Sequence, residues 1–426
     1  MKLIMVMLSV VLCAARFVHG AATNAVIGPR YMVFMREHDR SMSINRPESF
    51  NRQQFDETTR HFPGYSEPYR IKVGIGYIFS YFKYPMEDVE TCLKKFLALS
   101  LETDTPVVVK LDGENWLNGR PDLWNWWDPA APGYNPENRQ NVEWSSWSPD
   151  DALKISWRNW GRQIRVVPMM NLLSLRYRAE CHKAMDRLVP VILDWHRNLP
   201  PEKKDLFIGL NLGWESAVGN SSYYLPNGND LLNRSESEDP KTPAFVWDDV
   251  LRRGMVQLGF AALKTAGIRD SGDITEADLT EVARRHMEDL CRYANSLGIP
   301  REKIFSHGVG NGKGEKLYDS AVNSFSCPGW SEYFNSTNII ADEGIMRNIC
   351  RSDAPHWAAV EWLLLYPTSR YEIWKSSIFN TINASGCKYM CIFNWELLVN
   401  NKGEITEAVK AARDVLLESK EVCNEE

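Results

Sequence analysis

The sequence lacks the patterns that define several large classes of protein. After Ala15 there is no apolar run long enough to span a membrane, and the 49 Lys and Arg against 55 Asp and Glu leave a formal charge of −6. A mildly acidic chain argues against nucleic acid or an anionic membrane as the main partner. No Walker-type phosphate loop is present, and Gly74-Ile-Gly76 lies inside an expected strand rather than in a dinucleotide-binding turn.

Metal-binding patterns are also missing. None of the nine Cys belongs to a Cys-x-x-Cys pair or a Cys/His cluster, so the sequence predicts no metal site. We likewise expect no organic cofactor. The chemistry of this chain should therefore rest on its own side chains.

The N-terminus has the features of a secretory signal peptide. Leu3–Ala15 is an apolar core behind Lys2, and small residues precede Ala21, so we expect residues 1–20 to be removed. The remaining eight Cys are an even number, which favours disulfides in an oxidising compartment. Four Asn-x-Ser/Thr sequons also favour passage through the secretory pathway, at Asn220, Asn233, Asn335 and Asn383. We expect a secreted glycoprotein, with the lysosome as an alternative destination and the disulfide pairing open.

From Ile71 onward, short apolar runs rich in β-branched residues alternate with helical patterns. Expected strands cover residues 71–79, 105–112, 165–172, 206–216, 303–310, 320–330, 356–362 and 389–396. Expected helices cover 85–100, 150–160, 179–198, 247–266, 276–297, 371–384 and 404–419. This alternation predicts an α/β fold, a (β/α)8 TIM barrel over residues 71–426 with long loop insertions after strands 2 and 4. Residues 21–70 are expected to be an irregular segment packed on the barrel, with Tyr31–Met35 as an added strand.

Barrel active sites form at the carboxyl ends of the strands, so the polar and aromatic residues there are the candidate site. The fourth expected strand ends in Glu215, and the seventh carries Glu361 in an apolar setting where a carboxylate is costly unless it is used or paired. Candidates for substrate binding are Tyr77, Asp112, Glu114, Trp116, Asn171, Asn211, Trp214, His307, Trp330, Trp395 and Glu396. Carboxylates and Trp at one mouth suggest an oligosaccharide or polysaccharide, because indole faces stack on sugar rings and carboxylates bind hydroxyls.

Cleavage of a glycosidic bond requires two carboxyl groups in different protonation states. Glu215 and Glu361 fit by position, on facing walls of the barrel. The layout resembles the large clan of retaining glycoside hydrolases that includes β-galactosidases, β-mannanases and cellulases. That resemblance implies that Glu215 is the acid/base, that Glu361 is the nucleophile, and that Trp395 is the aromatic platform beneath the sugar. The clan usually has Asn before the strand-four Glu, where this chain has Trp214.

Other interpretations remain open from the sequence. Asp112 and Glu114 could serve an inverting hydrolase, Glu396 could pair with an Arg, and the same cleft could belong to a non-catalytic, lectin-like barrel or a transglycosylase. Residues 116–160 hold eight of the sixteen Trp. This segment is either an aromatic wall of a sugar cleft, with Trp116 and one or two of Trp124, Trp126 and Trp127 in contact, or a self-packed minicore.

Overall fold

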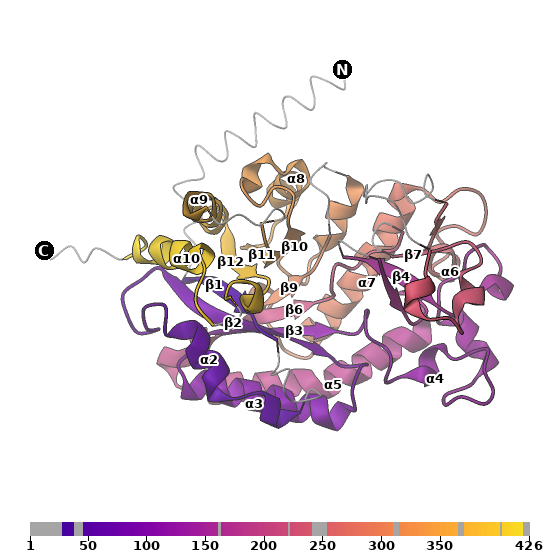
Figure 1. Cartoon of the computed structure of the whole chain (residues 1–426), viewed down its shortest axis with the longest axis horizontal. Coiled ribbons are helices and arrows are strands. Elements are labelled where there is room, and N and C mark those ends of the chain that lie inside the picture. Colours follow the sequence, from indigo (N-terminus) through magenta and orange to yellow (C-terminus); the bar gives the residue numbers. More distant parts are fainter. Residues whose placement is uncertain are drawn as a thin grey trace, which may run out of the picture.

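Eight parallel strands form a barrel in the computed structural model (Figure 1), which describes residues 28–37, 46–160, 163–219, 222–240, 254–309, 315–364, 370–400 and 403–420. The barrel strands are β1 (Arg30–Met35), β2 (Ile71–Ser80), β3 (Val107–Asp112), β6 (Phe207–Leu212), β9 (Ile304–Ser306), β10 (Gly329–Glu332), β11 (Trp357–Trp362) and β12 (Cys387–Ile392). They are hydrogen-bonded in the order β10-β11-β12-β1-β2-β3-β6-β9. Parallel bridges from Phe305 to Cys327 and from Gly308 to Trp330 join β9 to the β10 region and close the ring.

The barrel interior is filled by alternate residues of the strands, as the two-residue period of a β-strand requires. One buried cluster joins Tyr31, Val33 and Met35 of β1 with residues of the other strands. The residues between them face outward, where two larger clusters bury the helices against the barrel. Because both faces are covered, the strands are continuous apolar runs rather than alternating ones.

Helices form the outer layer and follow most of the strands. They are α2 (Arg52–Thr59), α3 (Met86–Glu102), α5 (Leu175–Asn198), α7 (Glu276–Ser296), α8 (Glu343–Arg351), α9 (Tyr371–Ile382) and α10 (Glu407–Leu417). Between β9 and β10 the described chain has only a short 3-10 helix, η10 (Lys316–Ala321). The expected helices over 276–297, 371–384 and 404–419 are confirmed to within a few residues.

A second, antiparallel sheet lies beside the barrel, at the right of Figure 1. Its strand order is β5 (Gln163–Val166), β4 (Ser156–Asn159), β7 (Ser222–Tyr224) and β8 (Val256–Gln257). β4 and β5 belong to the segment between β3 and α5, whereas β7 and β8 follow β6. Two insertions of the barrel therefore combine into one small sheet, with α4 (Pro121–Trp124) and α6 (Phe260–Thr265) near it.

Two predictions about strand identity are wrong, and the errors cancel. Tyr31–Met35 belongs to the first barrel strand, β1, which is hydrogen-bonded between β12 and β2. The expected third barrel strand over 165–172 instead contributes to β5 of the antiparallel sheet. Glu215 therefore still follows the fourth barrel strand and Glu361 still lies on the seventh. The first insertion follows the third strand, not the second, because the missed β1 shifts the count.

Two helix predictions also need correction. Residues 150–160 form a short 3-10 turn and then β4, because Trp157 and Asn159 pair across the antiparallel sheet. Of the helix expected over 247–266, residues 260–265 form α6, whereas residues 256–257 form β8 of the antiparallel sheet; residues 247–253 lie outside the described chain. The expected signal peptide, residues 1–20, also lies outside the described residues.

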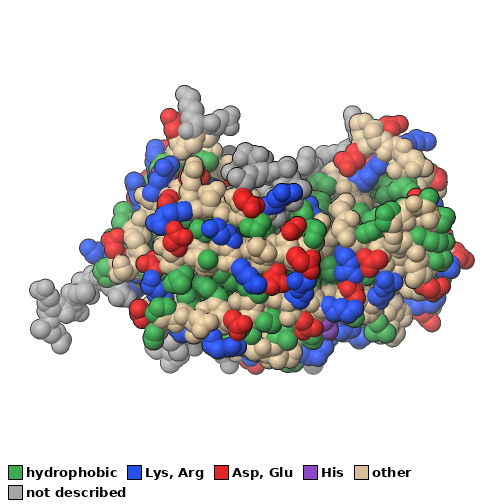
Figure 2. Space-filling model, turned by 90° about the horizontal axis from the view of Figure 1, so that it is seen from below, with side chains coloured by type: hydrophobic (Ala, Val, Ile, Leu, Met, Phe, Trp, Pro, Cys, Tyr) green, Lys and Arg blue, Asp and Glu red, His purple; other side chains and the backbone are tan. Residues whose placement is uncertain are grey.

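The described cysteines give little support to a disulfide framework. Six of them are buried and form no disulfide: Cys92, Cys181, Cys291, Cys327, Cys387 and Cys391. Cys350 is disulfide-bonded. In the described chain we find no helix that is both long and apolar enough to cross a membrane. Figure 2 shows Lys and Arg side chains interspersed with Asp and Glu over one face of the molecule, without an extended area of a single charge.

Candidate active site

A tight turn after β6 places Glu215 at the mouth of the barrel. Gly213 has a positive φ of 83°, and a Cβ there would lie 2.5 Å from the Ser216 hydroxyl, so the turn requires glycine. Glu215 itself has φ 49°, a left-handed conformation that is uncommon for a residue with a side chain. Its side chain is buried. A strained backbone at a buried carboxylate is a frequent property of functional sites.

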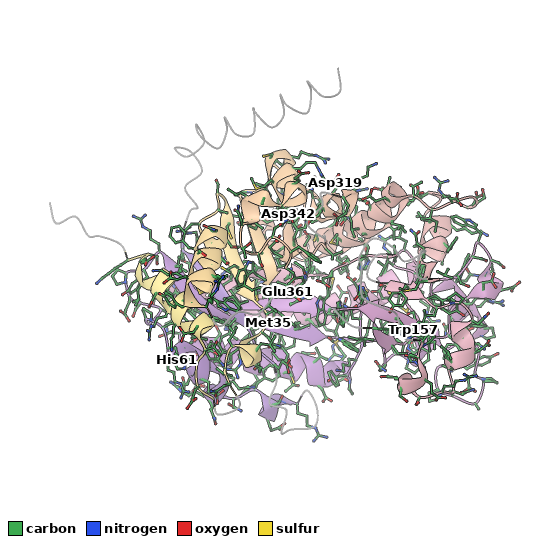
Figure 3. All side chains as sticks on the ribbon, turned by 45° about the horizontal axis from the view of Figure 1, so that its top comes forward. Met35, His61, Trp157, Asp319, Asp342 and Glu361 are labelled. Atoms are coloured by element: carbon green, nitrogen blue, oxygen red, sulfur yellow. The ribbon has the colours of Figure 1, made fainter. Side chains whose placement is uncertain are left out.

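Glu361 reaches the barrel interior because β11 is irregular. Ala358 and Val360 belong to the interior cluster, so strict alternation would turn Glu361 outward. The register of β11 against β12 shifts between Ala359 and Trp362, and such irregularities re-aim side chains. Glu361 consequently contacts residues of three other barrel strands or their ends, and Figure 3 shows it in the middle of the barrel ribbons.

Three side chains surround the Glu361 carboxylate. The Lys110 amine, from β3, donates a 3.1 Å hydrogen bond to Oε2, and both side chains are almost fully buried. The Tyr333 hydroxyl, just after β10, donates to Oε1. His307 Nε2 lies 3.9 Å from Oε2. Burial, together with the neighbouring Lys110, holds the pKa of His307 well below its usual range, so this imidazole is neutral.

Glu215 has a different electrostatic environment. Burial and the nearby negative charge of Glu361 raise its pKa to about 7, although a hydrogen bond from Ser331 and the charges of Lys110 and Arg158 oppose the shift. Ser331 also bonds to His307 Nε2 at 2.8 Å, so its hydroxyl lies between the histidine and the carboxyl group. The site therefore contains one carboxyl group that holds its proton near neutral pH beside another that a lysine and a tyrosine stabilise.

Asp112 and Glu114 are occupied by structural hydrogen bonds. Asp112 accepts from the Ser80 hydroxyl at 3.0 Å and from the Glu114 backbone N–H at 2.9 Å, which fixes the loop after β3. Glu114 Oε1 accepts from the Ser216 hydroxyl at 2.6 Å and contacts His286 Nε2 at 3.0 Å. Although burial acts in the opposite direction, His286 and Ser216 hold the pKa of Glu114 below its usual value. Because both carboxyl groups are engaged in these bonds, neither is well placed to act as the acid of an inverting hydrolase. The bond from Ser216 to Glu114 instead helps to position the turn that carries Glu215.

Three Trp rings line up beside this pair. Trp214 stacks on Trp160, with ring centres 5.3 Å apart and planes 20° apart, and Trp160 lies 5.9 Å from Trp116. The Lys110 amine lies 4.5 Å from the centre of the Trp214 ring. Trp214, which stands where the resembling clan has Asn, thus covers the cation that contacts Glu361.

The rest of the tryptophan-rich segment packs on itself. The indole N–H of Trp124 donates to the Leu117 carbonyl and that of Trp126 to the Leu153 carbonyl, both at 2.9 Å. Trp124 and Trp127 are stacked, with ring centres 5.6 Å apart. These contacts favour the minicore interpretation for these three residues. Of the four Trp residues predicted as sugar contacts in this segment, only Trp116 joins the row of rings beside Glu215, through Trp160.

Four predicted substrate contacts lie elsewhere in the fold. Tyr77 lies within β2 rather than at its end, and its ring centre is 4.5 Å from that of Phe50 in the core. Asn171 bonds Gln140 and Thr265 in the insertion. The indole N–H of Trp330 donates to the Tyr318 carbonyl in the core. Glu396 forms an ion pair with Arg36 at 2.9 Å, the alternative that the sequence left open.

Two further residues predicted to bind substrate, Trp395 and Asn211, are buried and contact other parts of the protein. Trp395 is buried against Phe34, with ring centres 5.3 Å apart and an edge-on geometry, so its burial opposes a role as an open platform for a sugar. Asn211 donates from its amide to the Phe305 carbonyl at 3.1 Å inside the barrel, and its Oδ1 has no hydrogen-bond partner among the described residues. His307 and Trp214, by contrast, lie beside Glu361 and Lys110, respectively.

Sequence reasoning missed Lys110, Tyr333 and Ser331. Lys110 has a detectable signal, because it is a single cation inside the apolar run TPVVVKLD, where burial without a partner would be costly. Ser331 and Tyr333 follow the sixth strand, whose weak pattern hides its end. Within the described chain, no group of three or more His, Cys, Asp and Glu side chains could hold a metal ion.

Comparisons with known proteins bear on the fold. No protein-family model and no curated protein matches the chain. Among solved structures, the catalytic domain of β-amylase from Paenibacillus polymyxa superposes with a TM-score of 0.52 and 10% identity, covering 93% of this chain and all of that one. An exo-β-1,4-mannosidase from Opitutaceae bacterium strain TAV5 gives 0.46 at 8% identity, with 93% of this chain but only 62% of that chain covered. A broad-specificity endoglucanase from an uncultured bacterium gives 0.42 at 8% identity and coverages of 86% and 83%. The β-amylase similarity agrees with the (β/α)8 fold.

Proposed function

We propose that this chain is a glycoside hydrolase that cleaves O-glycosidic bonds. The observation that carries the proposal is the pairing of two buried carboxyl groups with opposite tendencies. Glu215 has a pKa raised to about 7 by burial and by Glu361, whereas Glu361 receives hydrogen bonds from Lys110 and Tyr333. Hydrolysis of a glycoside needs one protonated and one ionised carboxyl group at a single site. A (β/α)8 neighbour named as a β-amylase supports the same reaction class.

In the proposed mechanism, Glu215 donates its proton to the glycosidic oxygen while the leaving group departs. A carboxylate oxygen of Glu361 attacks the anomeric carbon and forms a covalent glycosyl-enzyme. Glu215, now ionised, removes a proton from water, and the hydroxide attacks the anomeric carbon and releases Glu361. His307 stays neutral and holds Ser331 against the Glu215 carboxyl group. Two displacements would retain the anomeric configuration.

A second candidate is a non-catalytic, carbohydrate-binding barrel. It is favoured by the same two bonds to Glu361, since a carboxylate held by both a cation and a hydroxyl could be a fixed structural ion pair. Under this alternative, Trp116, Trp160 and Trp214 would supply stacking surface and no bond would break.

Activity against chromogenic glycosides separates the two candidates. We expect turnover of at least one glycoside, with Glu361→Ala and Glu215→Ala each lowering kcat by several orders of magnitude and leaving thermal unfolding cooperative. The exposed Glu137→Ala is the matched control and should keep full activity. NMR of the first-formed anomer then tests retention. Sugar binding without turnover, unaffected by Glu361→Ala, would favour the lectin-like barrel.

We also propose that the chain is secreted and carries N-linked glycans. The leader pattern and the sequons support this, and the side chains of Asn233 and Asn383 are exposed. Expression in a secretory host, followed by mass measurement before and after enzymatic deglycosylation, tests both points. Retention of the protein in the cell, with residues 1–20 still attached, would contradict the proposal.

A further inference from the structure

A buried arginine on β4 points to a second feature of the site. Arg158 is almost completely buried, and neither of its two terminal nitrogens has a hydrogen-bond partner among the residues that the structure describes. A guanidinium offers five N–H donors and remains charged, so burying it unpaired costs free energy. A buried guanidinium of this kind is stabilised when an acceptor group binds to it.

The opposite face of the same hairpin shows what a completed arginine site looks like here. Arg165 of β5 contacts Asp239 through two nitrogens and also donates to the Arg234 carbonyl at 2.8 Å. Trp157 donates its indole N–H to the same carboxylate at 2.8 Å. The sheet therefore satisfies one arginine with a carboxylate of its own and leaves Arg158 without one.

Arg158 lies against the candidate active site. Its positive charge acts on Glu114, Glu215 and Asp112, and its guanidinium carbon is 6.0 Å from the centre of the Trp160 ring. Trp160 in turn stacks on Trp214, the residue that precedes Glu215. The unpaired donors are thus within electrostatic reach of the proposed acid/base.

The nearby carboxylates are not hydrogen-bonded to this arginine. Asp112 is held by the β3 loop and Glu114 by Ser216 and His286. Burial and Glu361 raise the pKa of Glu215 to about 7, so this carboxyl group is only partly ionised at neutral pH. Arg158 therefore lacks a hydrogen-bonded counter-ion among the described residues, although negative charges lie near it.

Other donors lacking partners accompany Arg158. Ser222 of β7 is its direct cross-strand neighbour, and side chains of such neighbours share one face of a sheet. The Ser222 hydroxyl and the Trp160 indole N–H are both buried, and neither has a hydrogen-bond partner in the described chain. A guanidinium fork, a hydroxyl and an indole N–H together present donors to a group rich in acceptor oxygens.

We propose that Arg158, with Ser222 and Trp160, forms a subsite for an anionic oxygen group carried by the sugar substrate. The shared chemistry is that of a carboxylate on a uronic acid or of a sulfate ester, since both accept two parallel N–H donors from a guanidinium. A neutral hydroxyl would use one donor and leave the buried charge uncompensated. This inference rests on the proposed glycosidase function for turnover, but not for binding.

Matched substrates test the subsite through turnover. We would assay 4-nitrophenyl glycosides of glucose, glucuronic acid, glucose 6-sulfate, galactose and galacturonic acid, as both anomers, with the full-length protein. We expect the acidic member of a pair to be preferred in kcat/KM. Arg158→Met should reduce the acidic-to-neutral ratio roughly 30-fold or more, because a buried charge pair loses its partner. Arg158→Lys, which keeps the charge but loses the fork, should reduce the ratio less, and Ser222→Ala provides a milder change.

Arg165→Met is the matched control. It removes an arginine from the neighbouring strand that pairs with Asp239, so its acidic-to-neutral ratio should equal that of the unsubstituted protein. The thermal unfolding temperature distinguishes a binding role of Arg158 from a structural one, because the two roles predict opposite changes in Tm. Arg158→Met should leave the Tm unchanged or raise it, since a buried unpaired cation is removed, whereas an arginine needed for folding would lower it.

Calorimetric measurement of the binding of glucuronate, glucose 6-sulfate and glucose tests the anion subsite independently of the proposed glycosidase activity. Preference for glucuronate or for the sulfate, lost in Arg158→Met, supports the subsite and identifies which anion it takes. Turnover of neutral glycosides without any acidic preference overturns the subsite and leaves the glycosidase standing. Binding of an acidic sugar without turnover of any glycoside supports the subsite and overturns the glycosidase. Absence of both binding and turnover overturns both.

Discussion

The Lys110 amine donates a 3.1 Å hydrogen bond to Glu361 from the opposite side of the barrel interior, with exposed side-chain fractions of only 0% and 5%. One partner comes from the third strand and the other from the seventh. A buried pair of this kind has a strongly asymmetric response to mutation. Removing one partner leaves the other charge buried without a counter-ion, which lowers the stability of the folded protein by roughly 3–5 kcal/mol.

Lys110→Met should therefore impair both stability and activity. We expect kcat/KM to fall roughly 100-fold, because a carboxylate without its cation is a poorer ionised nucleophile in a buried site. The acid limb of the pH–rate profile should move to higher pH. Lys94→Met, which removes an exposed lysine paired with Glu90, is the control and should change neither quantity. An unshifted acid limb would show that Lys110 does not act on the reacting carboxylate.

Tyr333→Phe removes the hydroxyl that donates to Glu361 while keeping the ring. Hydrogen bonds to charged groups contribute roughly 1.5–3 kcal/mol, so kcat/KM should fall roughly 10- to 100-fold. Steady-state kinetics check the result. Tyr371→Phe removes a similar tyrosine–carboxylate bond, to Asp414 on the surface, and should leave kinetics unchanged. Equal effects from the two variants would contradict a specific role for Tyr333.

Glu215 should set the basic limb of the pH–rate profile. As the proposed acid it works in its protonated form, and its pKa of about 7 predicts that activity falls as pH rises above that value. Substrates with activated leaving groups need less protonation and should show a weaker limb. In Glu215→Gln the limb should disappear along with most of the activity toward unactivated glycosides. A basic limb that survives this substitution would assign the proton donor to another residue.

The same carboxyl group should make stability depend on pH. Its pKa rises from 4.5 in the unfolded chain to about 7 in the folded one, so the folded state binds the proton more tightly. Stability should therefore fall as pH rises from about 4.5 to 7 and then level off. Above pH 7, Glu215→Gln should be more stable than the parent by roughly 1–3 kcal/mol, with the difference disappearing below pH 4. Denaturant unfolding of both proteins at pH 4, 6 and 8 measures this.

Glu143 should anchor the insertion rather than act in catalysis. Its buried carboxylate accepts from the backbone N–H groups of Gly259, Ala261 and Ala262 at 3.1, 3.1 and 3.2 Å, at the start of α6. Glu143→Ala leaves these donors unsatisfied and should destabilise the protein by roughly 3 kcal/mol. Thermal unfolding provides the measurement, with the exposed Glu137→Ala as the neutral control. An unchanged Tm would contradict the anchoring role.

The repeating part of the fold could be predicted from the sequence, because a parallel barrel buries both faces of its strands and leaves long apolar runs. Residues 207–212 and 357–362 are of this kind. β1 has the same apolar character but is separated from β2 by a polar segment and α2, so the regular alternation of strand and helix patterns in the sequence begins only at Ile71. Residues 163–166 have the composition of a barrel strand, and composition alone does not reveal which sheet a strand joins.

The candidate site was predictable where a polar residue interrupts an apolar run, as at Glu361. The presence of a site residue could be predicted in this way, but the direction of its side chain, which backbone geometry decides, could not. The register shift in β11 turns Glu361 inward, whereas Trp330, on the neighbouring strand, packs in the core. Tyr333 contacts Glu361 from beyond the end of a strand, and no local pattern indicates a contact between segments so far apart in the chain.

The four-stranded sheet beside the barrel has a consequence for how this protein could have arisen and how it could be shortened. β4 from the insertion after β3 pairs directly with β7 from the insertion after β6. Deleting either insertion alone would expose an unpaired strand edge, which favours aggregation. The two insertions should therefore be gained, lost or transplanted together, as one module divided between two places in the chain.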